Sequence, residues 1–130
     1  MIRIDHVTFS YGEENENAGG VHDINLTVED GQCVVLCGES GSGKTTITCA
    51  LLAAMKNRKL AVRAFKSGPD YIDPMFHRQV IGVPSRNLDT FFSGADQIRE
   101  LYGYDRESFS YSVIEGAMGL YDGLGGTQKE

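Results

Sequence analysis

With 130 residues, the chain is long enough for one compact domain and little more, which excludes a multi-domain synthetase acting alone. Its 41% hydrophobic and 23% charged residues exclude disordered and fibrous proteins. Twelve Lys and Arg against eighteen Asp and Glu give a net charge of −6, so we expect no nucleic-acid partner and no grip on anionic membranes. The longest apolar run, 50–55, is far too short to span a bilayer, so we expect a cytoplasmic protein.

The first 32 residues have the pattern of an antiparallel hairpin. Apolar residues alternate with polar ones over 2–9, with one slip that indicates a bulged strand, and they alternate again over 24–28. The acidic, glycine-ended segment 13–20 between them is typical of a solvated turn.

The pattern then changes to that of an α/β protein. Residues 33–37 are continuously apolar, as in a parallel strand covered on both faces, and Ile47, Leu51 and Met55 recur at helical spacing from Lys44 to about 59. We expect further strands over 60–65 and 110–116, a loop or broken helix over 68–85, and one or two short helices over 88–101 with a break at Gly94. The predicted fold is a single α/β domain, in which a mostly parallel sheet of residues 33–130 is flanked by helices and preceded by the hairpin of residues 1–32.

Three cysteines and three histidines carry little signal. Cys33, Cys37 and Cys49 are too clustered for a disulfide framework, so we expect reduced thiols. His6, His22 and His77 show no metal-ligand spacing and are expected to be surface or packing residues.

The strongest motif is the segment 38–45, which fits G-x-x-x-x-G-K-[ST] between a buried-strand pattern and a helical one. Its glycines let backbone N–H groups turn toward phosphate oxygens, and the helix N-terminus adds partial positive charge. Lys44 is expected to reach the outer phosphates of ATP as the catalytic cation, and Thr45 to ligate Mg²⁺. The motif identifies the predicted α/β fold as that of a P-loop NTPase. The predicted nucleotide-binding residues are Gly38, Glu39, Ser40, Gly41, Ser42, Gly43, Lys44, Thr45 and Thr46.

A magnesium site needs a further carboxylate near the carboxyl ends of neighbouring parallel strands. Glu115 ends one predicted strand, and Asp70 and Asp73 follow another, three residues apart between prolines. The alternatives are turn-forming aspartates at 70 and 73 and a strand-end surface acid at 115. Asn87 and Asp89 are expected to start a helix rather than to bind a ligand.

Residues 1–48, through the glycine-rich motif, resemble the start of an ABC-type ATPase, especially a cobalt or peptide importer subunit. The resemblance implies that Tyr11 stacks on adenine and that a permease is the partner chain. The alternative for Tyr11 is an ordinary strand-end tyrosine. The chain departs from that family because it has no signature segment and no Asp-Glu pair after an apolar strand.

Residues from about 40 to 127 are similar to the nucleotide-binding domain of cobyrinic acid a,c-diamide synthases. Four ordered segments carry this resemblance: 40–46, 65–77 with Gly-Pro-Asp-Tyr-Ile-Asp-Pro, 86–89, and 114–123 with Glu-Gly-Ala-Met-Gly-Leu-Tyr-Asp-Gly. The resemblance implies ATP-dependent activation of a corrin or related tetrapyrrole carboxylate as an acyl phosphate, which ammonia drawn from glutamine converts to an amide. It implies that Thr45, Asp70 and Glu115 hold Mg²⁺, and that catalytic Asp73 and Asp122 lie with Tyr71 toward the substrate.

The departures from that family leave alternatives open. Its members carry a glutaminase half with a nucleophilic cysteine, whereas every cysteine here lies at or before Cys49, so we expect a glutaminase partner chain. We expect either a fusion-like hybrid of two P-loop families or an incomplete gene product. Three hypotheses follow: an amidating ATP-dependent ligase domain, an ABC-type subunit for metal import, or a nucleotide-binding fragment without turnover. With few parallel strands, an unpaired sheet edge favours a homo-oligomer.

Overall fold

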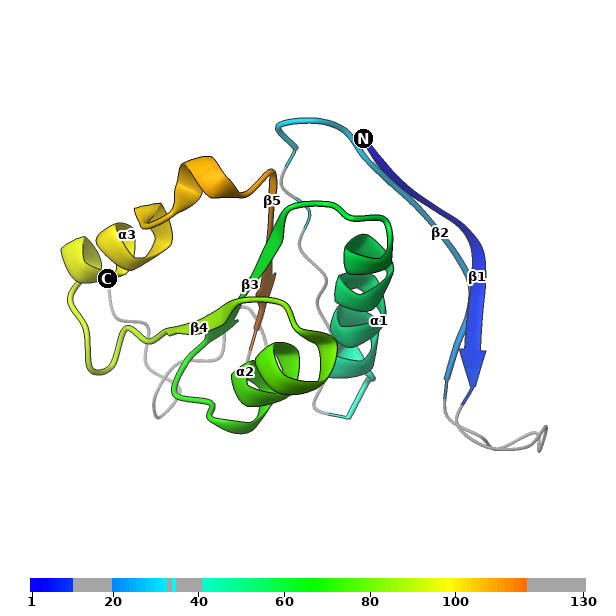
Figure 1. Ribbon diagram of the computed structural model, residues 1–130. Helices are drawn as coiled ribbons and strands as arrows, with labels where there is room; N and C mark the ends of the chain where they lie inside the picture. The colour runs from blue at the N-terminus through cyan, green and yellow to red at the C-terminus, as the bar shows by residue number, and fades with distance from the viewer. Residues whose placement is uncertain (11–19, 33, 35–40, 117–130) are drawn as a thin grey trace. The chain divides into compact units, whose positions relative to one another are not determined.

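The computed structural model describes residues 1–10, 20–32, 34 and 41–116 (Figure 1). The chain divides into two compact units, Met1–Leu36 and Cys37–Glu130. No helix in the described ranges has both the length and the apolar character that a bilayer crossing requires. The sequence predicted a single domain made of a hairpin, 1–32, and a core, 33–130, and that division stays a prediction.

The first unit contains an antiparallel pair of strands, β1 (Ile2–Ser10) and β2 (Gly20–Val28). The register runs from Ile2 opposite Val28 to Ser10 opposite Gly20, and it shifts on both sides of Val7. The hairpin and its bulge, predicted from one slip in the alternation, are therefore confirmed. The predicted strand 33–37 lies outside the described residues, apart from Val34.

The second unit is built on a three-stranded parallel sheet with the order β4-β3-β5. The central strand β3 (Val62–Ser67) pairs with β4 (Ser85–Leu88) on one side and with β5 (Tyr111–Glu115) on the other. Five of the six β3 residues are buried, as expected of a central parallel strand. The strands predicted over 60–65 and 110–116 are thus confirmed, with the first displaced by two residues.

Helix α1 (Lys44–Asn57) begins directly after Gly43, at the residue predicted from the sequence. Leu52 and Met55, three residues apart on one side of the helix, are buried against the sheet, and Arg58 follows the last turn. The segment predicted as a loop or broken helix is a short helix α2 (Ile72–Phe76) that runs into a π-helical turn, η1 (His77–Ile81).

The region predicted to hold one or two short helices begins with strand β4 instead, so the helix starts later. Helix α3 spans Ala95–Gly103, after Gly94, whose N–H donates to Gln97 Oε1 at 3.0 Å, and a 3-10 turn, η2, spans Arg106–Ser108. The prediction that Asn87 starts a helix is wrong, because Asn87 lies in β4 opposite Lys66. Asp89 also starts no helix, since its carboxylate accepts the N–H of Phe91 in a local turn.

Helices cover both faces of this sheet (Figure 1). Val62, Ala64 and Lys66 point to one face, where α1, α2 and η1 pack, because side chains alternate along a strand. Phe65 points to the other face and contacts Tyr102 of α3, with ring centroids 5.4 Å apart. The α/β fold with flanking helices agrees with the prediction.

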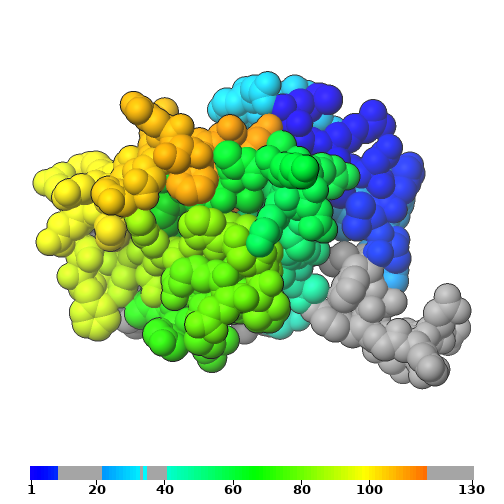
Figure 2. Space-filling model, viewed as in Figure 1, coloured from blue at the N-terminus to red at the C-terminus, as the bar shows by residue number. Residues whose placement is uncertain are grey.

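Several large apolar side chains lie at the surface of this unit. Ile72, Phe76 and Val80 recur every four residues along α2 and η1 and are exposed. Phe91 and Phe92, which precede α3, are exposed as well. Figure 2 shows the α2–η1 segment, in green to yellow-green, at the surface. An apolar row of this kind is typical of a surface that another protein segment covers.

Candidate functional site

A row of polar side chains crosses the sheet at one level. Lys66 of β3 is in register with Asn87 of β4 and with Glu115 of β5, so the three side chains point to the same face. They stand toward the carboxyl ends of parallel strands, which is the edge where α/β proteins bind ligands. Two residues earlier along the strands, Ser85 of β4 is in register with Ala64 of β3, and both side chains point to this same face.

Lys66 is the centre of a buried ion cluster. Its Nζ donates to Asp73 Oδ2 at 2.6 Å and to Glu115 Oε1 at 3.0 Å, and it lies 3.5 Å from Asp70 Oδ2. The Lys66 side chain is only 6% exposed. Burial alone would lower the pKa of Lys66, but the hydrogen bonds to Asp73 and Glu115 outweigh burial and raise it. The ammonium therefore stays charged and holds three carboxylates together.

Thr45 joins the glycine-rich segment to this cluster. It is the second residue of α1, and its hydroxyl donates to Glu115 Oε1, the same oxygen that accepts from Lys66. The Glu115 side chain is 2% exposed. The structure thus brings Thr45, Asp70, Asp73 and Glu115 together, residues that stand far apart in the sequence.

The loop after β3 is shaped so that its aspartates face Lys66. Asp70 Oδ1 accepts the N–H groups of Ile72 and Asp73 at 2.9 and 3.2 Å, which opens α2, and Asn87 Nδ2 donates to the Asp70 carbonyl at 2.7 Å. Burial would raise the pKa of Asp70, but these backbone hydrogen bonds and Lys66 lower it below its usual range. Asp70 is therefore both a turn-forming aspartate and a member of the cluster, so the two alternatives for this residue coexist.

His77 lies beneath the cluster and is fully buried. Its Nδ1 lies 3.1 Å from Ser85 Oγ, and its Nε2 lies 3.9 Å from Glu115 Oε2. Within the described part of the chain, His77 Nε2, Glu115 Oε2 and Asn87 Oδ1 are buried without a hydrogen-bond partner. Burial lowers the pKa of His77 despite the opposing attraction of Glu115 and Asp73, so the ring is neutral at pH 7. His77 is a packing residue, as predicted, and it also faces the site.

The described part of the glycine-rich segment has the backbone that the motif requires. Gly41 and Gly43 have φ of 82° and 86°, in the left-handed region that glycine adopts without strain. Ile47 N–H donates to the Gly43 carbonyl at 3.0 Å. This bond closes the first turn of α1, whose backbone N–H groups lie directly after Gly43. Lys44 Nζ donates to Ser42 Oγ at 3.4 Å. Thr46 is partly buried in the first turn of α1.

Several predicted site residues lie outside the described residues: Tyr11, Gly38, Glu39, Ser40 and Asp122. Tyr71, predicted to lie toward the substrate, precedes α2 and is 77% exposed. Cys49 is a free thiol in α1, partly buried, and burial with the carboxylates of Glu115 and Asp73 raises its pKa. A thiol in this setting is unreactive.

The donor set fits magnesium bound together with a nucleotide. Among the described residues no three His, Cys, Asp or Glu side chains form a protein cage for a metal ion. Mg²⁺ does not need such a cage, because it binds through one or two protein oxygens, phosphates and water. Thr45 Oγ1 and the Glu115 carboxylate that accepts from it supply oxygens of that kind at the start of α1.

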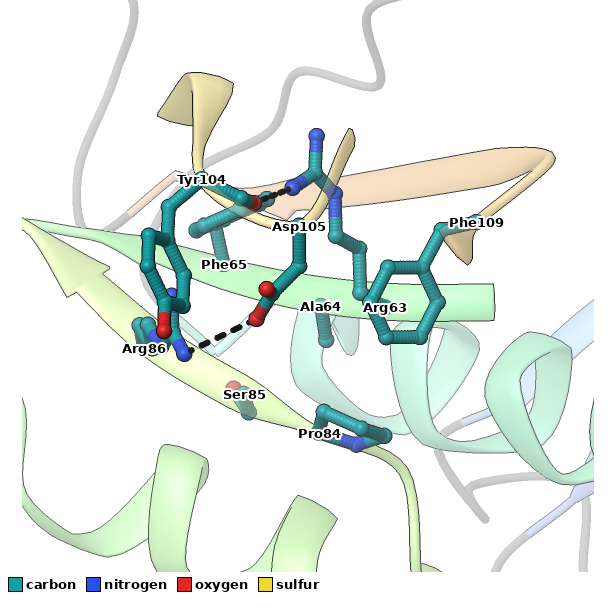
Figure 3. A pocket seen from close by; sticks show the side chains of 9 residues that line it. All are labelled: Arg63, Ala64, Phe65, Pro84, Ser85, Arg86, Tyr104, Asp105 and Phe109. Carbon is teal, nitrogen blue, oxygen red and sulfur yellow. Dashed lines mark hydrogen bonds and ion pairs between the residues drawn. The ribbon is translucent and has the colours of Figure 1, made fainter. Parts of the chain in front are cut away.

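A small pocket lies elsewhere in the second unit, near the amino ends of β3 and β4 (Figure 3). Arg63 Nη1 donates to the Tyr104 carbonyl at 2.6 Å there, and Arg86 lies 3.4 Å from Asp105. The cavity of about 120 Å³ is smaller than ligand sites usually are, at about 300 Å³ or more. It is packing space rather than a nucleotide site.

The sequence analysis missed Lys66 as a member of the site. The sequence does hold a signal for Lys66, which ends an apolar strand directly before Ser-Gly-Pro-Asp. A lysine at such a position is buried only if carboxylates pair with its ammonium group. Asn87 was missed because β4 was not recognised as a strand. For His77 the sequence offered only its place just after the Asp-Pro segment.

The neutral, buried His77 predicts a pH dependence of stability. Between its lowered folded pKa and the unfolded value near 6.5, only the unfolded chain binds the proton, so stability falls as pH falls, by at most about 1.4 kcal/mol per pH unit. Urea denaturation at pH 7.5 and 5.5 should show this loss, and His77→Gln should lack it. An equal loss in the variant would contradict the burial of a neutral ring.

Comparisons with known proteins agree with both resemblances. A family model described as ABC transporter matches residues 21–116, which is more than half of the chain. Cobyrinate a,c-diamide synthase from Synechocystis is 52% identical over 92 residues, covering 70% of this chain and 19% of that protein. The proteins of that name from Thermoplasma acidophilum and Clostridium acetobutylicum are 50% identical over 92 residues and 47% identical over 96 residues, with 71% and 74% of this chain and 21% and 22% of theirs covered.

An alignment that spans 70% of 130 residues includes residues 40–91 wherever it begins, so it contains the start of α1 together with Lys66, Asp70 and Asp73. The chain spans about a fifth of the length of these curated relatives. No solved structure matches the chain. Both predicted resemblances are confirmed, and with them the assignment of the α/β fold to the P-loop type.

Proposed function

Because the chain belongs to the ABC transporter family and shares half its residues with cobyrinate a,c-diamide synthases over 70% of its length, we propose that it binds Mg·ATP and activates a tetrapyrrole carboxylate for amidation. The observation that carries the proposal is the contact of Thr45 with Glu115 at the start of α1, with Lys66 on the same carboxylate oxygen. It joins a phosphate-binding segment to an acidic cluster, as a phosphoryl-transfer site requires.

In the proposed site the segment 38–46, a Walker A motif, binds the phosphates through backbone N–H groups, and Lys44 supplies a cation. Thr45, Glu115 and Asp70 hold Mg²⁺, which when bound neutralises negative charge on the phosphates. Lys66 donates to Asp73 and to Glu115 and holds both carboxylates in place. Tyr11, if the ABC-like segment acts as in that family, stacks on the adenine.

The proposed reaction needs no general base, because the attacking carboxylate is already ionised. Its oxygen forms a bond to the γ-phosphorus while the bond from that phosphorus to the ADP oxygen breaks, and ADP leaves. Ammonia then forms the amide bond, phosphate leaves, and the surplus proton passes to solvent. The chain aligns the reactants and stabilises charge, and Asp73, Asp122 and Tyr71 lie toward the substrate.

The proposal includes partners. Ammonia comes from a glutaminase on a partner chain. The exposed apolar row of Ile72, Phe76 and Val80 supports an association with a further protein surface, which includes the predicted homo-oligomer. We place the activity in the cytoplasm, where ATP and a biosynthetic tetrapyrrole are available.

The test is ATP turnover by the chain with ammonium salt, with and without a corrin carboxylate such as cobyrinate. Turnover should rise with the tetrapyrrole and fall at least a hundredfold in Glu115→Gln, since a missing charge at the metal site costs several kcal/mol. Asp96→Asn, which removes an exposed carboxylate from α3, is the matched control and should keep full turnover. Indifference of the turnover to every corrinoid and related ring would reject the amidation proposal.

The ABC family match over 21–116 and the confirmed hairpin favour a second candidate, an ATP-binding subunit of a metal importer. It predicts ATP turnover that ignores tetrapyrroles and a membrane permease that co-purifies with the chain. A third candidate is a nucleotide-binding fragment, for which ATP would bind without hydrolysis. The same assay therefore separates all three.

A further inference from the structure

We infer that His77 is a positioning residue that fixes the carboxylate of Glu115 from below, through an Nε2–H group directed at Oε2. The inference rests on the proposed function, because the value of a fixed Glu115 is its role in holding Mg·ATP. In this role His77 acts through Glu115 and does not touch nucleotide or substrate.

The geometry places two unsatisfied atoms opposite each other. Glu115 Oε1 already accepts from Thr45 and from Lys66, whereas Oε2 has no partner among the described residues. His77 Nε2 lies 3.9 Å from Oε2, and it is likewise without a hydrogen-bond partner there. Both side chains are at least 98% buried, so neither atom is satisfied by bulk water.

Ser85 is compatible with a proton on either ring nitrogen, and the Glu115 carboxylate decides between the two arrangements. In one arrangement the Ser85 hydroxyl donates to Nδ1, which leaves Nε2 as an N–H group aimed at the carboxylate. In the other, Nδ1–H donates to Ser85, and the lone pair of Nε2 faces a carboxylate oxygen across 3.9 Å in a dry interior. The second arrangement sets two hydrogen-bond acceptors against each other without a proton between them, so the first is favoured.

The backbone fixes the ring in this place. The His77 carbonyl accepts Val83 N–H at 2.9 Å, closing the π-helical turn, and Arg78 Nη1 donates to the Ser85 carbonyl at 2.7 Å. These bonds hold η1 against β4, so His77 and Ser85 keep their distance. The separation of 3.9 Å from Nε2 to Oε2 is longer than a hydrogen bond, as contacts in ligand-free sites often are, and a rotation of the carboxylate about its terminal torsion would shorten it.

The consequence concerns how well Glu115 is oriented. A carboxylate held only at Oε1 rotates about its terminal torsion, which is broad for such groups. A donor at Oε2 restricts that rotation and keeps both oxygens in the plane that a cation beside Thr45 requires. Groups that orient metal ligands in this way typically change metal affinity 10- to 100-fold when removed.

The test uses the full chain and two readouts. The first is the ¹⁵N spectrum of the histidine rings without nucleotide, which should show His77 protonated at Nε2 and a change of its Nδ1 signal in Ser85→Ala. The second is ATP affinity measured across a Mg²⁺ titration and again in EDTA. His77→Phe should raise the Mg²⁺ concentration for half-saturation about tenfold, with ATP affinity in EDTA unchanged.

Three further variants separate positioning from packing. His77→Gln, whose amide N–H can replace Nε2–H, should restore most of the Mg²⁺ dependence, and Ser85→Ala should lose part of it. Gln79→Ala is the matched control, because Gln79 is an exposed residue of the same turn, and its Mg²⁺ titration should match the wild type. If His77→Phe does not fold, Ser85→Ala and the ring spectrum still decide the question.

The outcomes are distinguishable. A His77 protonated at Nδ1, or an unchanged Mg²⁺ titration in both His77→Phe and Ser85→Ala while the wild type binds Mg·ATP, overturns the positioning role and leaves the proposed function standing. A wild-type chain that binds no Mg·ATP overturns both.

Discussion

Replacing Lys44 with alanine is expected to weaken ATP binding more than a hundredfold. Lys44 opens α1 directly after Gly43, and the proposal places its ammonium on the outer phosphates of ATP. Hydrogen bonds to charged groups are worth about 1.5–3 kcal/mol each, so losing the cation costs about 3 kcal/mol or more. Calorimetric titration of ATP with Mg²⁺ measures the loss directly.

The control for this experiment lies at the other end of the same helix. Arg58→Ala removes an exposed cation just after α1 and should leave ATP affinity unchanged. Circular dichroism should show equal helix content in both variants. If Lys44→Ala binds ATP as tightly as Arg58→Ala does, the phosphates do not lie at the start of α1.

The second large effect is on stability and involves Lys66. Lys66→Met keeps the apolar stem but removes the ammonium, so Glu115 and Asp73 are left close together without their cation. Breaking a buried ion pair by removing one partner costs about 3–5 kcal/mol. Urea denaturation should show a lower midpoint with an unchanged slope.

A double variant supplies the internal check. Glu115→Gln in the Lys66→Met background removes one of the uncompensated buried charges, so the double variant should be more stable than Lys66→Met alone. A loss below about 1 kcal/mol for Lys66→Met would mean that the cluster is solvated rather than buried, because exposed ion pairs contribute no more than that.

The parts of this protein that were predictable are those encoded by local patterns. Helix α1 was predictable to its first residue. Gly43 can adopt the left-handed φ that precedes the helix, and after Lys44 the apolar residues Ile47, Leu51 and Met55 recur at helical spacing. The meeting of Asp70, Asp73 and Glu115 was predictable as well, because the two aspartates follow β3 and Glu115 ends β5, which runs parallel to β3.

The parts that were missed depend on tertiary pairing. Strand β4 reads Ser-Arg-Asn-Leu, which has no alternation or apolar run of its own, and it is a strand only because β3 supplies the backbone partners. The misplacement of Asn87 follows from that. Lys66 was missed for a related reason, since a lysine is buried only where distant residues bring it carboxylates.

The central claim is that the start of α1 and the carboxylates beside Lys66 form one Mg·ATP site. The most direct test replaces Mg²⁺ with paramagnetic Mn²⁺ in the presence of ATP and records which backbone amide signals broaden. The account predicts broadening at Gly41–Thr46, at 70–73 and at Glu115, and sharp signals from α3 on the opposite face of the sheet. Sharp signals at both Thr45 and Glu115, with ATP and Mn²⁺ bound, would contradict it.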